Sequence, residues 1–183
     1  MPIFLPDFKK KFPYIHIDLK EGSQQYLLSL IEQRKVDFCI MQLPSKHSSV
    51  VFEHLAYEHI LLAVNKCNPI LNQLSNHSNE PTSYLSVEDF LKFSKEPFIL
   101  MKEENKLRDL TQNFLDKYDV TTSPVLETTN IMTALNLVSA GLGVTFVPEV
   151  ILKVKDRPKD LVFFKIDNPP LIWEIGIAYK ALS

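Results

Sequence analysis

Glycine and cysteine are both scarce in this sequence. Only four of the 183 residues are glycine, and only two, Cys39 and Cys67, are cysteine. A chain of this length needs no disulfide staples, because it buries roughly 70% of its unfolded surface on folding. Cys39 stands in an apolar run and is interpreted as a small buried hydrophobic residue. Two unpaired thiols are typical of a protein in a reducing compartment.

Basic residues are not concentrated anywhere along the chain. The net charge is −2, and the only short basic run is the three lysines at 9–11. Such a run is typical of a solvated helix end rather than of a nucleic-acid patch. We therefore expect this chain alone to bind DNA poorly.

Long uninterrupted hydrophobic runs are also absent. Residues 1–6 are too short an apolar run for a signal peptide and lack a basic start. The longest apolar stretch, residues 134–152, contains Asn136, Pro148 and Glu149. Two buried elements explain that stretch better than a membrane span does. The sequence thus predicts a cytoplasmic protein with no membrane partner.

Motifs for catalysis are missing as well. The sequence contains no Gly-x-Ser-x-Gly, P-loop, Cys-x-x-Cys or His-Glu-x-x-His pattern. His54 and His59 are five residues apart in an extended segment, so they would point to opposite faces and could not share a metal directly. We expect no catalytic residue, no metal site and no cofactor, and we predict that the protein is not an enzyme.

Helical and extended patterns alternate along the chain, which predicts an α/β fold. The succession of strand, helix and strand over residues 15–41 predicts a right-handed parallel βαβ unit. Its second strand is apolar enough to be covered on both faces. Segments 50–55 and 58–65 could also form one long bent strand. Helices are predicted at 4–12, 23–34, from 86, at 104–118 and from 130, and strands at 15–20, 36–41, 50–55, 58–65, 97–101, 124–127, 144–147, 161–166 and 172–179.

Two of the four glycines stand together in residues 139–149, SAGLGVTFVPE. Gly141 follows a helical pattern at the position where a left-handed C-cap belongs. Gly143 would permit a tight, closely packed entry into a buried strand at 144–147, and Pro148 would end that strand's hydrogen bonding. No Lys-Ser or Lys-Thr follows, so the segment is a weak candidate for a phosphate loop.

Several short motifs, in order along nearly the whole chain, resemble the effector-binding domain of LysR-type transcriptional regulators. The most specific is the last, which contains both glycines. The matching segments are LPDF (5–8), FPYIHIDLKEG (12–22), VDFCI (36–40), LAYEHILLAV (55–64), NPI (68–70), PFIL (97–100) and LVSAGLGVTFVP (137–148).

The resemblance implies a type II periplasmic-binding-protein-like fold. Two lobes, each a mixed sheet flanked by helices, would be joined by two crossover strands, and a small effector would bind between them. The implied first lobe is discontinuous, residues 1–58 with 148–183, and the second lobe is 59–147. Family members form homodimers or larger homo-oligomers and bind DNA through an N-terminal winged helix-turn-helix, which this sequence lacks. An extra strand precedes the LPDF helix in the family, so we expect the first lobe to lack that strand.

Effector contacts are expected where strands end beside helix N-termini, because unpaired N–H groups and the helix dipole favour anions there. Ser23 and Gln24 form one such start, and Thr128, Thr129 and Asn130 form the other. Both match positions at which family members contact effectors, although plain N-capping explains them equally well.

Four further candidates follow strands that the family match turns toward the cleft: Gln42, Leu43, Met101 and Lys102. Lys102 could pair with an effector carboxylate, pair with Glu103 or Glu104, or remain solvated. Thr145 and Phe146, near the second crossover, complete the candidate set, and Phe146 can instead be a core residue. Trp173 is expected to pack against a lobe or a partner.

The leading hypothesis is therefore a sensing domain that binds an anionic small molecule between its lobes. One alternative is a solute-binding receptor of the same fold. The other is an enzyme on a similar two-lobed fold, which would need catalytic groups in the cleft.

Overall fold

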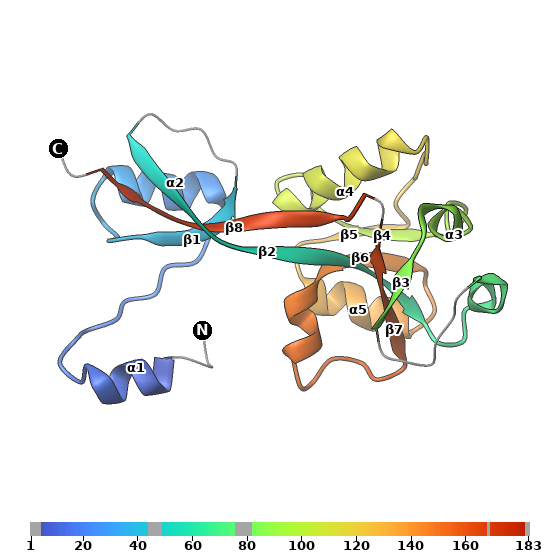
Figure 1. Cartoon of the computed structure of the whole chain (residues 1–183), viewed down its shortest axis with the longest axis horizontal. Helices are drawn as coiled ribbons and strands as arrows, with labels where there is room; N and C mark the ends of the chain where they lie inside the picture. The colour runs from blue at the N-terminus through green and yellow to red at the C-terminus, as the bar shows by residue number, and fades with distance from the viewer. Residues whose placement is uncertain (1–4, 44–48, 76–81, 168, 182–183) are drawn as a thin grey trace.

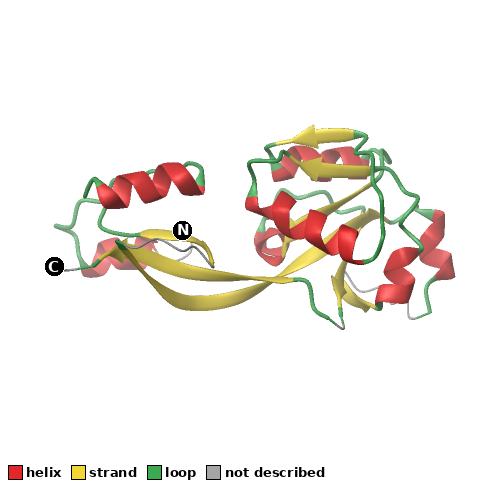
Figure 2. Ribbon diagram, turned by 90° about the horizontal axis from the view of Figure 1, so that it is seen from above, coloured by secondary structure: helices red, strands yellow, loops and turns green. Residues whose placement is uncertain are grey.

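Two bodies of unequal size are joined by two long antiparallel strands, β2 (Val50–Asn65) and β8 (Ile172–Lys180) (Figures 1 and 2). The computed structural model describes residues 5–43, 49–75, 82–167 and 169–181. β2 pairs with β8 as far as His59 and then continues into the larger body. The single bent strand considered for residues 50–65 is confirmed, and its register shifts between His54 and Ala56, as at a β-bulge.

The described residues of the smaller body form a three-stranded antiparallel sheet with one packed helix. β1 (Cys39–Leu43) pairs with β8, which pairs with the first half of β2. Helix α2 (Gln24–Glu32) covers one face of this sheet and buries Leu30 and Ile31. Helix α1 (Leu5–Lys11) buries no residue and lies apart from the sheet (Figure 1).

The larger body is built on a mixed sheet. β6 (Val144–Pro148) and β7 (Leu161–Ile166) pair antiparallel with the second half of β2. β4 (Phe98–Met101) runs parallel to both β6 and β5 (Leu126–Thr128), and β3 (Thr82–Leu85) runs parallel to β7. The helical elements are η1 (Pro69–Gln73), α3 (Val87–Leu91), α4 (Lys106–Lys117), α5 (Ile131–Ser139) and η2 (Glu149–Lys153).

Two apolar cores form in the larger body. One contains Phe90 of α3, Phe114 of α4 and Phe146 of β6. The other contains Leu135 and Val138 of α5, with Phe163 of β7. Because β2, β4, β6 and β7 each supply residues to both cores, the sheet is covered on both faces, as expected for strands that are apolar throughout.

The predicted strand at 15–20 is wrong. Residues 15–20 have no regular secondary structure, and Ile15, Ile17 and Leu19 are 39–52% exposed. A strand needs a neighbour to take its ladder hydrogen bonds, and none of the described strands pairs with this segment. The parallel βαβ unit is therefore also wrong, because β1 pairs antiparallel with β8.

The strand predicted at 36–41 begins later and is covered on one face only. It starts at Cys39, and its side chains alternate: Cys39 and Met41 are buried, whereas Phe38 and Ile40 are 53% and 44% exposed. The buried residues pack under α2. The apolar run therefore reflects one packed face and one open face, not two packed faces.

Both glycines of the 139–149 segment have the backbone roles predicted for them. Gly141 follows α5 with φ +81°. Gly143 has φ +149°, and a Cβ there would lie 2.0 Å from the carbonyl oxygen of Pro97. That closeness allows Val144 to donate to the same oxygen at 2.9 Å, which places β6 beside β4.

The lobe boundaries, 1–58 with 148–183 and 59–147, remain a prediction. β7 lies in the first lobe by that division, yet it pairs with the second half of β2 and with β3 in the sheet of the larger body.

Within the described part of the chain, no helix is long and apolar enough to cross a membrane.

Candidate functional site

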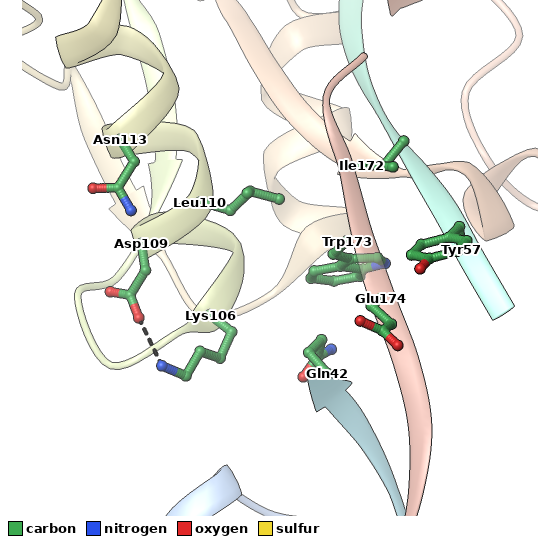
Figure 3. A pocket seen from close by; sticks show the side chains of 9 residues that line it. All are labelled: Gln42, Tyr57, Lys106, Asp109, Leu110, Asn113, Ile172, Trp173 and Glu174. Atoms are coloured by element: carbon green, nitrogen blue, oxygen red, sulfur yellow. Dashed lines mark hydrogen bonds and ion pairs between the residues drawn. The ribbon is translucent and has the colours of Figure 1, made fainter. Parts of the chain in front are cut away.

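A pocket of about 380 Å³ lies where the two bodies meet (Figure 3). One wall is α4, which contributes Lys106, Asp109, Leu110 and Asn113. The other wall comes from β1 and the crossover strands and consists of Gln42, Tyr57, Ile172, Trp173 and Glu174. A molecule in this pocket would therefore touch the smaller body, the larger body and both strands that join them.

Trp173 forms the centre of the crossover wall. Its indole Nε1 donates to Oε2 of Glu58, its cross-strand neighbour on β2, at 2.7 Å. The other carboxylate oxygen of Glu58 accepts from the backbone N–H of Val150 in η2 at 2.7 Å. Glu58 thus ties the two crossover strands to the larger body and fixes the indole, which faces Leu110 across the pocket in Figure 3.

The charged groups of the pocket are partly exposed. Nζ of Lys106 lies 3.1 Å from Oδ2 of Asp109, one helical turn away on α4. Oε1 of Glu174 lies 2.8 Å from Nδ1 of His54. The lining thus has two carboxylates and one ammonium group, and the ammonium group is already paired.

Among the candidate residues of the smaller body, Gln24 and Gln42 contact each other. Ser23 caps α2 by accepting from the N–H of Tyr26 at 3.3 Å, as predicted for an N-cap. Gln24 donates through Nε2 to the backbone oxygen of Gln42 at 3.3 Å, and its Oε1 is buried with no partner among the described residues. Gln42 also lines the pocket. Leu43 is the last residue of β1.

A second group of candidates gathers at the ends of β4 and β5 in the larger body. The N–H of Lys102 donates to the oxygen of Thr128 at 3.0 Å, and Oγ1 of Thr128 accepts from the N–H of Asn130 at 3.1 Å. Asn130 caps α5 by accepting from Met132 and Thr133. Thr129 and Lys102 are exposed.

Lys102 has no ion pair among the described residues, so the pairing with Glu103 or Glu104 that the sequence allowed is not seen.

Three other candidates have buried side chains. Met101 is 3% exposed, Thr145 is 1% exposed and Phe146 is 2% exposed. Thr145 donates to the backbone oxygen of Ile99 at 2.6 Å. The ring of Phe146 lies 5.9–6.3 Å from those of Phe90, Phe98 and Phe114, so the core role considered for Phe146 is the one supported.

Sequence reasoning missed the α4 wall of the pocket. The pattern at 104–118 predicted a helix, but nothing in that pattern distinguishes a core wall from a pocket wall. It also missed Arg108, which donates to the Met101 oxygen at 3.0 Å and pairs with Glu127. These contacts hold Arg108 against the ends of β4 and β5, and a basic residue in the first turn of the helix was its only signal.

Metal and thiol chemistry find little support in the described residues. No group of three or more metal-ligating side chains is found among them. Burial raises the pKa of the Cys39 thiol, which keeps it protonated and weakly nucleophilic. Cys67 is exposed, and neither cysteine forms a disulfide.

Two α/β bodies, two crossover strands and a pocket at their junction define a two-lobed ligand-binding domain of the periplasmic-binding-protein type, which confirms the predicted fold. The prediction of a mixed sheet in each lobe is wrong for the smaller body, whose described strands all pair antiparallel because β1 joins the antiparallel crossover pair. The model of the LysR substrate binding domain matches residues 1–183. This chain belongs to the LysR substrate-binding-domain family.

Curated relatives are transcriptional regulators. The chain is 27% identical over 183 residues to the HTH-type transcriptional regulator AlsR of Bacillus subtilis, covering 98% of this chain and 56% of that protein. It is 23% identical over 180 residues to the regulator OxyR of Escherichia coli, covering 98% and 55%. The chain thus spans about half the length of the curated relatives it matches.

Solved structures with the same fold include two complexes with small molecules. The BenM effector binding domain with its effector benzoate has a TM-score of 0.81 at 19% identity, covering all of this chain and 78% of that one. The Synechocystis PCC6803 CcmR regulatory domain with 2-PG has a TM-score of 0.81 at 17% identity, covering 100% and 82%. At these identities the likeness establishes the fold alone.

Proposed function

We propose that this chain is the effector-sensing domain of a LysR-type transcriptional regulator. A small molecule would bind between the lobes and change their relative orientation. The observation that carries the proposal is the match of the whole chain to the LysR substrate-binding-domain family. A ligand can shift the orientation only by binding one arrangement of the lobes more tightly than the other.

The proposed effector is a small anion. Ser23 and Asn130 are the N-caps of α2 and α5, and the N–H groups and dipole of a helix N-terminus favour negative charge. Lys102, exposed and beside Thr128, would supply a positive charge. Oε1 of Gln24, buried without a partner among the described residues, would accept from a ligand hydroxyl or amide. The buried residues Met101, Thr145 and Phe146 would support the residues that touch the ligand. The proposed set is completed by Gln42, Leu43 and Thr129.

Partners follow from the relatives. BenM was solved with benzoate, and full-length CbnR was solved with its target DNA. We propose a homodimer or larger homo-oligomer in the cytoplasm whose DNA contacts come from a winged helix-turn-helix outside these 183 residues. We propose no enzymatic activity. A solute-binding receptor of the same fold is the weaker alternative, because the curated relatives are regulators.

Peroxide sensing by Cys39 is not part of the proposal. Some relatives are hydrogen peroxide-inducible genes activators. A sensing thiol must reach its thiolate form, and burial raises the pKa of Cys39. Cys39 also packs in the core of the smaller body, which fits a structural role.

A thermal-shift screen of small carboxylates and phosphates tests the anion proposal. With a hit in hand, Lys102→Met should weaken its binding roughly two- to fivefold, as expected for one exposed ion pair. Lys95→Met is the matched control, because Lys95 is exposed and precedes β4 rather than following it. If no carboxylate or phosphate raises the melting temperature, or if both variants lose affinity equally, the anion proposal is wrong.

A further inference from the structure

The pocket between α4 and the crossover strands is not explained by the proposed anion site. Of the predicted effector residues, only Gln42 lines it. Its remaining walls are the α4 face and the strand residues around Trp173. We propose that this pocket is a second small-molecule site that binds an organic cation, an amine attached to an apolar or aromatic body.

The apolar part of the ligand would lie between the two walls. Leu110 reaches from α4 toward Trp173 of β8, and Ile172 adds a further apolar side chain (Figure 3). The hydrogen bond from Trp173 Nε1 to Glu58 fixes the indole, so its face needs no ordering when a ligand arrives. At about 380 Å³ the pocket is at the small end of the roughly 300–1,000 Å³ range of ligand sites.

The charge of the lining selects a cation. Lys106 is the sole cationic side chain among the described lining residues, and Asp109 already pairs with it at 3.1 Å. Glu174 adds a second carboxylate, which leaves the lining with an excess of one negative charge. His54 contacts Oε1 of Glu174, and Oε2 has no partner in the part of the chain that the structure describes.

One ammonium group of the ligand could therefore interact with both a carboxylate and the face of Trp173. A carboxylate forms a charge-assisted hydrogen bond with an N–H donor. A tryptophan face attracts a cation through its ring quadrupole, more strongly than the other aromatic side chains do. An anion would instead face Glu174 and Asp109 and would have to compete with Asp109 for Lys106.

Three probes with one ring and different head groups test the site: 2-phenylethylamine, 2-phenylethanol and 3-phenylpropionate. Trp173 is the only tryptophan in the chain, so its fluorescence reports on this pocket directly. We expect the amine to change that fluorescence with a Kd of about 1 mM or tighter. The alcohol should bind roughly three- to tenfold more weakly, and the propionate should give no saturable change.

Variants identify the charged partner. Glu174→Gln should weaken amine binding roughly three- to tenfold and leave the alcohol unchanged. Asp116→Asn is the matched control, because Asp116 lies on α4 outside the pocket and accepts from Gln112 at 2.8 Å. An unchanged melting temperature for each variant verifies that it is folded.

The proposal fails if the amine gives no saturable change, if the propionate binds as tightly as the amine, or if Glu174→Gln binds the amine as well as the unaltered chain does. Lys102→Met separates this site from the proposed anion site. It should leave the amine affinity unchanged whether or not an anionic effector is found.

Discussion

The two bodies differ in how their sheets are covered. In the larger body, helices and loops pack on both faces, and two apolar cores result, one of them rich in phenylalanine. In the smaller body the described residues pack on the face under α2, around Ile31, Cys39, Met41, Val50 and Ala178. On its other side, Phe38 and Ile40 are exposed. Since buried apolar area supplies most folding free energy, the larger body should be the more stable unit and the smaller one should open first.

Phe146→Ala should have the largest effect. The ring is almost fully buried among Phe90, Phe98 and Phe114, so its removal leaves a cavity and costs about 3–5 kcal/mol of unfolding free energy. Urea denaturation followed by circular dichroism measures this loss. Tyr84→Ala truncates a largely exposed aromatic residue of the same body and should change stability by about 0.5 kcal/mol or less. Equal losses in the two variants would contradict this account of the core.

Ile31→Ala should act mainly within the smaller body. Ile31 is fully buried in a small cluster, and its truncation should cost about 2–4 kcal/mol there. Hydrogen exchange should show faster exchange in α2 and β1 and little change in α4 and α5. Ile40→Ala, on the open face of β1, is the matched control and should be nearly neutral. Uniform loss of protection through the chain would show that the two bodies unfold as one unit.

Local signals in the sequence predicted the helix boundaries well. Ser23, Ser86 and Asn130 each cap the helix that the sequence assigned to them, and Gly141 ends α5. Capping depends on neighbours within a few residues, so a single sequence contains it. The segment at 15–20 has an equally clear alternating pattern. It failed because pairing depends on a partner strand, and alternation cannot show that a partner is present.

The site was harder to predict than the fold. Lys102, Thr128 and Asn130 were expected at strand ends beside a helix start, and the structure does bring them together. The pocket is formed by α4 and β8, which are more than fifty residues apart in the chain. The sequence placed Leu110 in a predicted helix and indicated only that Trp173 would pack against a lobe or a partner. Whether a side chain contacts a core or lines a pocket depends on which distant elements lie opposite it. A local sequence pattern does not contain that information.

Asp89→Asn should have the smallest effect of the three substitutions on stability, and it tests a buried polar contact in the larger body. The side chain of Asp89 is 8% exposed and accepts from Lys92 at 2.5 Å and from the N–H of Ser75 at 3.2 Å. The hydrogen bond from Lys92, with those from Ser75, holds the pKa of Asp89 below its ordinary value of 3.8. A carboxylate with a lowered folded-state pKa stabilises the fold above its unfolded pKa, and this contribution is lost as pH falls through the folded value.

The substitution should therefore cost about 1–2 kcal/mol at pH 7, because an amide offers one acceptor oxygen where the carboxylate offers two. The difference between the two proteins should shrink as pH falls below about 4, where the unfolded carboxyl becomes protonated. Urea denaturation at a series of pH values measures both quantities. Asp116→Asn, on the exposed face of α4, should show neither the loss nor the pH dependence. If the difference for Asp89→Asn stays constant down to pH 2, the carboxylate charge is not what ties α3 to the segment at Ser75, and the shape of the side chain must account for the loss.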